Sequence, residues 1–264
     1  MTGPVHVTVW GGGRTPAPRA VLAHGTMTWG TDEYGFAAQR PLAEMAELWV
    51  VDRRGFGAST DVGESDYELD AVDIAGLMEG GAHLVGHSYG GVVAMLAAAR
   101  RPADVRSLAL IEPAAHRAAA GDAVVAAALV RMRAAIAQAP AVTPQEWLRG
   151  STEAVGMPPL DPTPARLRAA ATAMRERPCW EADVPLDALA AGPYPKLVIC
   201  GTWETAPAAY REAAGEALIA CAAVVAREIG ADVLRVEGAS HWPHAERPEA
   251  VNAALQRLWR RAAG

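Results

Sequence analysis

The chain has 264 residues, of which 51% are hydrophobic, and its formal net charge is −6 at pH 7. This length suits one large α/β domain, or a core with an inserted subdomain. The acidic balance and the lack of a basic cluster exclude nucleic acid and an anionic membrane surface as expected partners. The three cysteines lack metal or redox spacing, and no apolar run approaches a membrane span or a signal segment. We therefore expect a cytoplasmic protein with free thiols.

The first part of the chain predicts strands that alternate with helices. Apolar and β-branched runs predict strands at residues 5–10, 20–23, 48–51, 82–85 and 105–111. Helical patterns lie at residues 41–48, 67–78 and 92–100, with Asp66 as the cap of the second helix. A glycine-rich turn at residues 11–13 follows the first strand.

From residue 113 to residue 195 the alternation of strand and helix stops. Helices are predicted instead at residues 118–139, 144–155 and 164–177, with proline-containing loops between them. A helical insertion in an α/β pattern is typical of a lid over an active site. We therefore expect a core made of residues 1–112 and 196–264, and a helical cap at residues 113–195.

The pattern of the core resumes after the insertion. Strands are predicted at residues 196–200 and 233–236, and helices at residues 208–229 and 248–261. The total is seven strands in an alternating order. This order predicts an α/β fold with a mostly parallel sheet flanked by helices and joined by right-handed crossovers.

One motif lies between a predicted strand and a predicted helix. It reads Gly86-His87-Ser88-Tyr89-Gly90-Gly91 and matches the pattern G-x-S-x-G. Strand, tight turn and helix form the context in which this pattern makes a nucleophile elbow, where the serine hydroxyl projects above the sheet. A nucleophilic serine also needs a base, an orienting acid and an oxyanion hole.

Candidates for these three functions follow the ends of other predicted strands. His241 follows the last strand and is the expected base, because the order serine, acid, histidine is typical of this elbow. Glu204 and Glu112 each follow a strand, and both are candidate acids. We favour Glu204, because its strand adjoins the histidine strand in the expected topology, and retain Glu112 as the alternative. The small-residue loop 24–26 is the candidate oxyanion hole.

Taken together, these motifs resemble the α/β-hydrolase superfamily. The resemblance covers nearly the whole chain outside the predicted cap and rests on His24-Gly25-Thr26, on residues 52–57, on the elbow, on Gly201-Thr202-Trp203-Glu204 and on His241. It implies a Ser88-His241-acid triad, with an oxyanion held by the backbone N–H groups of Thr26 and Tyr89. The chain departs from the pattern in its short opening and in offering glutamate where aspartate is commoner.

The serine at the elbow restricts the reaction. Members of this superfamily that displace at carbon, such as epoxide hydrolases and haloalkane dehalogenases, use aspartate there. A serine activated by histidine attacks carbonyl groups instead. We expect a hydrolase of hydrophobic small-molecule esters, thioesters or lactones that needs no metal and no organic cofactor. The alternatives that stay open are acyl transfer, a carbon–carbon hydrolase or lyase on the same triad, and a ligand-binding protein without turnover.

Aromatic and sulfur-containing side chains near the motifs suggest how the substrate is bound. The candidate substrate-binding residues are Met27, Trp29, Trp180, Trp203 and Trp242. No arginine stands beside the motifs as a clamp, which disfavours a strongly anionic substrate. The sequence leaves the oligomeric state open, and a homodimer is compatible with it.

Overall fold

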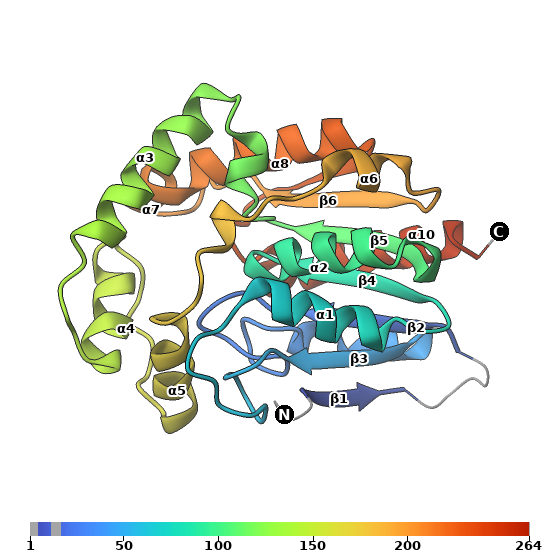
Figure 1. The fold of residues 1–264 in the computed structure, drawn as a ribbon, viewed down its shortest axis with the longest axis horizontal. Coiled ribbons are helices and arrows are strands. Elements are labelled where there is room, and N and C mark those ends of the chain that lie inside the picture. The colour runs from blue at the N-terminus through green and yellow to red at the C-terminus, as the bar shows by residue number, and fades with distance from the viewer. Residues whose placement is uncertain (1–4, 12–16, 264) are drawn as a thin grey trace.

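A sheet of seven strands forms the middle layer of the fold (Figure 1). The computed structural model describes residues 5–11 and 17–263, so the glycine turn predicted at residues 11–13 lies largely outside the described residues. The strand order is β1-β3-β2-β4-β5-β6-β7. All neighbours are parallel except β1 and β3. The prediction of a mostly parallel, seven-stranded sheet is confirmed.

The strands lie close to their predicted positions. They are β1 (His6–Trp10), β2 (Arg19–Ala23), β3 (Glu47–Asp52), β4 (Ala82–His87), β5 (Val105–Ile111), β6 (Lys196–Gly201) and β7 (Asp232–Val236). Successive residues of β2 fall alternately into two hydrophobic clusters, one on each face of the sheet. A strand that is buried on both faces reads as a continuous apolar run, which explains why the central strands are easy to find in the sequence.

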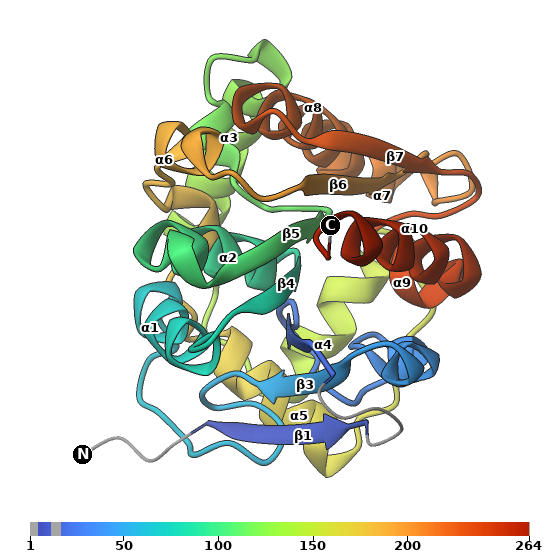
Figure 2. The same cartoon turned by 90° about the vertical axis from the view of Figure 1, so that its right-hand side faces the viewer.

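Helices cover both faces of the sheet (Figure 2). Helices α1 (Tyr67–Leu77), α2 (Tyr89–Arg100), α6 (Leu186–Ala191) and α8 (Glu216–Ile229) contribute to the cluster on one face. The 3₁₀ helix η1 (Ala37–Glu44) and helix α10 (Pro248–Arg261) contribute to the cluster on the other. The short helix α7 (Ala208–Tyr210) continues through a π-helical turn (Arg211–Gly215) directly into α8, and the short helix α9 (Pro243–Glu246) lies just before α10.

Two helix starts show how local sequence decides structure. The Asp66 side chain accepts a hydrogen bond from the Glu68 N–H at 2.7 Å, as predicted for the cap of α1. The helix predicted at residues 41–48 is instead the 3₁₀ helix η1, with Pro41 in its interior. Proline cannot donate the hydrogen bond that an α-helix needs, so only a short, tighter helix forms before β3.

Three helices lie beyond the carboxyl ends of the parallel strands (Figure 1). They are α3 (Ala123–Ala137), α4 (Pro144–Glu153) and α5 (Pro164–Ala173), and we call them the cap. All three lie within the predicted insertion, and both α3 and the last helix of the insertion, α6, pack on α8. In the part of the chain that the structure describes, no helix is long and apolar enough to cross a membrane.

Helix α5 is tied to the core by polar contacts. Its Arg166 pairs with Asp32 at 2.9 Å, and its Thr172 hydroxyl donates to the Gly55 carbonyl at 2.7 Å. Just beyond the helix, Ser65 forms a parallel bridge with Glu176. Helix α4, by contrast, packs mainly on α5.

Candidate active site

The motif at residues 86–91 forms a sharp turn between β4 and α2. Ser88 stands at its apex with φ 53° and ψ −116°, a conformation that costs a non-glycine residue free energy. The flanking glycines are required by close approach of the backbone: a Cβ on Gly86 would lie 2.2 Å from the Gly90 oxygen, and one on Gly90 would lie 2.1 Å from the Ala23 oxygen. The turn therefore has the geometry expected of a nucleophile elbow.

His241 lies against this serine. Its Nε2 is 3.0 Å from the Ser88 Oγ, although the two residues are 153 positions apart in the chain. The His87 Nε2 is 2.8 Å from the His241 carbonyl oxygen, and the two rings are 4.9 Å apart. Since a carbonyl oxygen only accepts, the His87 Nε2 carries a proton and donates it. The loop after β7 is thus held so that its imidazole faces the elbow.

Glu204, the acid favoured from the sequence, does not contact His241. Its side chain is exposed and accepts a hydrogen bond from the Gly238 N–H at 3.2 Å. The physical reason is the preceding residue: Trp203 is fully buried and has φ 59°, so the chain turns and places Glu204 at the surface. The structure thus brings Ser88 and His241 together without Glu204.

Glu112, the alternative acid, is fully buried at the end of β5. Its Oε1 accepts hydrogen bonds from the Gly201 N–H at 2.6 Å and from the Trp203 Nε1–H at 3.2 Å. Its Oε2 and the His241 Nδ1 are both buried and have no partner among the described residues. The Trp203 ring lies beside both residues, with its centroid 6.0 Å from that of His241. A buried acceptor and a buried imidazole nitrogen without partners make Glu112 the better candidate acid.

Backbone strain is concentrated at this site. Among the described residues, the non-glycine residues with positive φ are Met27, Ser88, Glu112 and Trp203. They follow strands β2, β4, β5 and β6, so all four lie in loops at the carboxyl ends of parallel strands. Strained backbone persists where the surrounding structure holds it and gathers at functional sites. The strained residues therefore gather at the edge of the sheet where Ser88 and His241 lie.

The candidate oxyanion hole lies between two loops. Neither the Thr26 N–H nor the Tyr89 N–H donates a hydrogen bond to another described residue. Tyr89 is the first residue of α2, where the backbone N–H has no acceptor within the helix. A Cβ on Gly25 would lie 3.2 Å from the Ser88 Cβ, so the loop that carries Thr26 passes directly beside the serine.

The profile of the Alpha/beta hydrolase family matches residues 20–254, which is most of the chain and includes every element of the site. The chain belongs to the alpha/beta hydrolase family. No functionally curated protein matches it by sequence.

Solved structures share the fold of this alpha/beta hydrolase at low sequence identity. A thermophilic esterase from Thermogutta terrifontis is 23% identical, with a TM-score of 0.65 over 98% of this chain and 93% of the esterase. Est816, described as an N-acyl homoserine lactone degrading enzyme, is 20% identical, with a TM-score of 0.62 and 96% of each chain covered. A 2-hydroxy-6-oxo-6-phenylhexa-2,4-dienoate hydrolase from Rhodococcus sp. strain RHA1 is 20% identical, with a TM-score of 0.63 over 98% of this chain and 96% of the other.

Burial shifts the pKa of both Glu112 and His241 in this alpha/beta hydrolase. It raises the pKa of Glu112 to about 7, against the opposing effect of the hydrogen bond from Gly201. Burial also lowers the pKa of His241 to about 3, and the neighbouring His244 and His116 act in the same direction. The imidazole of the resting protein is therefore neutral and can accept a proton from Ser88.

A cavity of about 300 Å³ opens above the elbow, between the core and the cap. Met27 and Trp242 line it, as predicted from the sequence, together with His87 and His241. The other predicted substrate-binding residues do not line it. Trp203 is fully buried beside Glu112, Trp180 packs on the core, and the Trp29 ring lies under the Arg166 guanidinium.

Several polar residues that line this cavity were not predicted from the sequence, and the three largest are Tyr34, Arg166 and Tyr210. They come from a loop after β2, from α5 and from α7, and no local motif marks them. The Arg166 guanidinium is paired with Asp32 and lies 3.2 Å from the Glu33 carboxylate. Its charge is thus already balanced, and the rest of the lining is largely apolar.

The thiols of Cys179, Cys200 and Cys221 are buried and free. Within residues 5–11 and 17–263 no group of three or more histidine, cysteine or acidic side chains is arranged to hold a metal ion.

Proposed function

We propose that this alpha/beta hydrolase cleaves a hydrophobic small-molecule ester, thioester or lactone through an acyl-enzyme on Ser88. The observation that carries the proposal is the 3.0 Å contact between the His241 Nε2 and the hydroxyl of a serine held in a strained turn. A serine becomes a useful nucleophile only with a neighbouring base to take its proton. The contact supplies that base, and the strain keeps the hydroxyl clear of the sheet.

The reaction would run in two halves. In the first, His241 takes the Ser88 proton while the oxygen attacks the carbonyl carbon, and the N–H groups of Thr26 and Tyr89 hold the resulting oxyanion. The imidazolium then gives its proton to the leaving alcohol, thiol or hydroxyl group. In the second half, His241 activates a water molecule, which attacks the acyl-enzyme and releases the acid.

We propose Glu112 as the acid of the triad, in place of Glu204. An ionised Glu112 would hold the Nδ1–H of His241 and stabilise the imidazolium that forms during each half-reaction. The unpartnered Glu112 Oε2 and His241 Nδ1 support this role, and so does the placement of Trp203 against both residues. The exposed carboxylate of Glu204 has no such contact.

The cavity supports a substrate with an apolar, uncharged acyl or alcohol part. Its volume of about 300 Å³ suits a small molecule, and apolar groups dominate its lining. Its one arginine, Arg166, is paired with Asp32, so the lining residues offer no unpaired positive charge that could bind an anionic substrate. The cap would close over this cavity as the lid predicted from the sequence.

The test is turnover of p-nitrophenyl butyrate together with labelling by a fluorophosphonate, in wild type and in Ser88→Ala. We expect ester hydrolysis and stoichiometric labelling of the wild type, and neither in the variant. Labelling of Ser88 without turnover of any ester would refute the hydrolase and support a binding protein. Cleavage of a β-diketone with esters untouched would refute ester hydrolysis and assign carbon–carbon chemistry to the same serine.

A further inference from the structure

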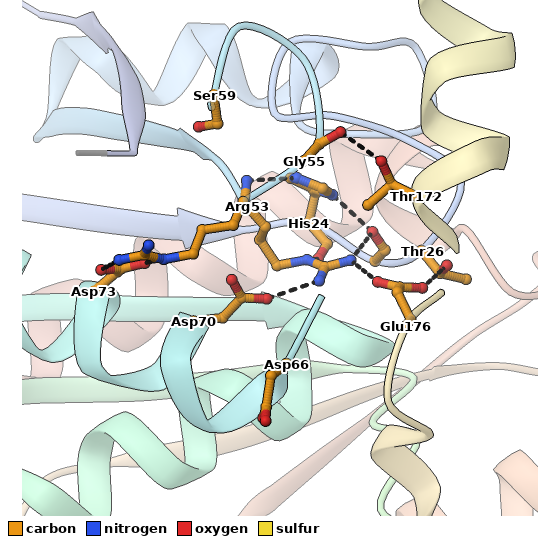
Figure 3. Close-up of polar contacts among 12 residues, drawn as sticks. His24, Thr26, Arg53, Gly55, Ser59, Asp66, Asp70, Asp73, Thr172 and Glu176 are labelled. Atoms are coloured by element: carbon orange, nitrogen blue, oxygen red, sulfur yellow. Dashed lines mark hydrogen bonds and ion pairs between the residues drawn. The ribbon is translucent and has the colours of Figure 1, made fainter. Parts of the chain in front are cut away.

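Arg53 is a fully buried cation beneath the candidate oxyanion loop (Figure 3). Its guanidinium pairs with Asp70 on α1 at 2.9 Å and with Glu176, just after the cap helix α5, at 2.6 Å. Burial alone would lower the pKa of Arg53, but the charges of Glu176 and Asp70 raise it, so the guanidinium stays charged. Removing a guanidinium and two carboxylates from water costs desolvation free energy that their pairing need not recover. Stability alone therefore does not explain why these three charges are buried together.

The same guanidinium also holds the backbone next to Thr26. The Arg53 Nε donates to the His24 carbonyl, and its Nη2 donates to the Gly25 carbonyl, each at 3.0 Å. The His24 Nδ1 lies 2.7 Å from the same Gly25 oxygen, and its Nε2 accepts from the Arg53 N–H at 3.0 Å. The His24 Nδ1 therefore carries the proton and donates to Gly25. Two donors thus fix the direction of one carbonyl group.

The orientation of this carbonyl determines where the Thr26 N–H points. The Gly25 carbonyl and the Thr26 N–H belong to one planar trans peptide group, so they point in opposite directions. Holding the oxygen toward Arg53 holds the N–H away from it, on the other side of the peptide plane. A charge-assisted hydrogen bond to the oxygen also polarises the peptide group and strengthens the N–H as a donor.

Glu176 brings the cap into this arrangement. One oxygen of its carboxylate accepts from Arg53, and the other accepts from the Thr26 hydroxyl. The backbone on either side of Glu176 is fixed, because the Ser65 N–H donates to the Arg175 carbonyl at 3.1 Å and the Ser65 carbonyl accepts from the Arg177 N–H at 2.8 Å. A single side chain from the end of the cap therefore contacts both Arg53 and Thr26.

We propose that Arg53 and Glu176 are positioning residues that aim the Thr26 N–H into the oxyanion hole. This inference rests on the proposed function, because it assigns these residues to the reaction of Ser88. It also makes the oxyanion hole depend on the cap: the Thr26 peptide is held in its working orientation only while the end of α5 is docked on the core.

The test is Glu176→Gln, which keeps the size of the side chain but removes the charge shared by Arg53 and Thr26. The readouts are kcat and KM for p-nitrophenyl butyrate and the inhibition constant of phenylboronic acid, which forms a tetrahedral adduct on serine. Removing an oxyanion donor typically costs 10²- to 10³-fold in kcat, so misaligning one should cost about 10-fold. We expect that loss in kcat, a matching loss in boronate affinity, and a KM within about twofold of wild type.

Arg168→Gln is the matched control. Arg168 also ties α5 to the core, through Asp61 and the Ser59 carbonyl, but it does not contact the loop at residues 24–26. We expect it to lower the melting temperature about as much as Glu176→Gln and to leave kcat unchanged. An equal loss of kcat in Arg168→Gln would overturn the proposal, since general loosening of the cap would then account for the effect.

The Thr26 backbone amide signal in a ¹H–¹⁵N spectrum gives a readout that does not depend on turnover. We expect this signal to shift in Glu176→Gln and to stay in place in Arg168→Gln. If the wild type hydrolyses no ester but the Thr26 signal still shifts in Glu176→Gln, the proposed function is refuted and the positioning contact is supported. Wild-type kcat, boronate affinity and amide signal in Glu176→Gln would overturn the inference while the hydrolase stands. Should Glu176→Gln fail to fold, Thr26→Val removes the same hydroxyl contact and must show a loss in kcat in the same direction.

Discussion

Glu112→Gln is the most informative single substitution in the proposed triad. The amide oxygen of glutamine can still accept the hydrogen bonds from the Gly201 N–H and the Trp203 indole, so the surrounding loop should keep its shape. The new NH₂ group would replace the unpartnered Oε2 and would donate to the His241 Nδ1. The imidazole would then carry its proton on Nε2, and that nitrogen could no longer take the proton of Ser88.

The size of the effect follows from this change of tautomer. Replacing the aspartate of a serine triad by asparagine lowers kcat by about 10⁴. At about 1.4 kcal/mol for each factor of ten, the expected loss of transition-state stabilisation is about 5.5 kcal/mol. The paired substitution Glu204→Gln should change kcat by less than about twofold, because an exposed amide oxygen can still accept from the Gly238 N–H.

The assay is kcat and KM for p-nitrophenyl butyrate at pH 8, with thermal unfolding followed by circular dichroism. Glu112→Gln should unfold at or above the wild-type temperature, since an ionised carboxylate no longer has to be buried. A larger loss of kcat in Glu204→Gln than in Glu112→Gln would refute the assignment. So would a Glu112→Gln enzyme with wild-type activity.

Three further outcomes are expected. Ser88→Gly should abolish turnover and raise the free energy of unfolding in urea by about 1–3 kcal/mol, because glycine adopts φ 53° without strain; a less stable variant would contradict the strain argument. Burial raises the pKa of Glu112 from an ordinary 4.5 to about 7, so its contribution to stability is full below pH 4.5 and is lost as the pH rises through 7. Relative to Glu112→Gln, the wild type should therefore lose about 3 kcal/mol between pH 4.5 and pH 8, and parallel stability curves would show that Glu112 is not buried as an acid. Dialysis against EDTA should leave ester turnover unchanged, whereas a clear loss would reveal a metal in the reaction.

Local patterns in the sequence were sufficient for the fold and for the elbow. The strands of the core are buried on both faces and read as apolar runs, and the glycines around Ser88 are required by backbone contacts closer than any side chain allows. His241 could be singled out because it lies just past the last strand in the order expected of the triad, whereas His244 lies beyond Pro243, close to the final helix. The apolar runs, the glycine pattern and the order of the motifs are all properties of the linear sequence, so they can be recognised before the chain folds.

The acid and the cavity depend on information of another kind. Glu204 and Glu112 both follow a strand, and the choice between them turns on the backbone at Trp203, whose φ of 59° sends the next residue to the surface. Tryptophan is not a residue type that predicts a left-handed backbone conformation, so the sequence does not indicate this turn. Tyr34 and Tyr210 meet in the cavity from distant elements, so their shared position emerges only when the chain has folded.

The attachment of the cap is asymmetric, and this has a consequence for protein engineering. The side that carries α5 is joined to the core by ion pairs, by a hydroxyl contact at Thr172 and by a backbone bridge, whereas α4 packs mainly on α5. Residues of α4 nevertheless reach the cavity wall, at Ser151 and Thr152. A mutant library that seeks new substrate preferences can therefore be confined to α4 and the loop that follows it. Substitutions there would alter the shape of the cavity and leave the contacts between α5 and the core intact.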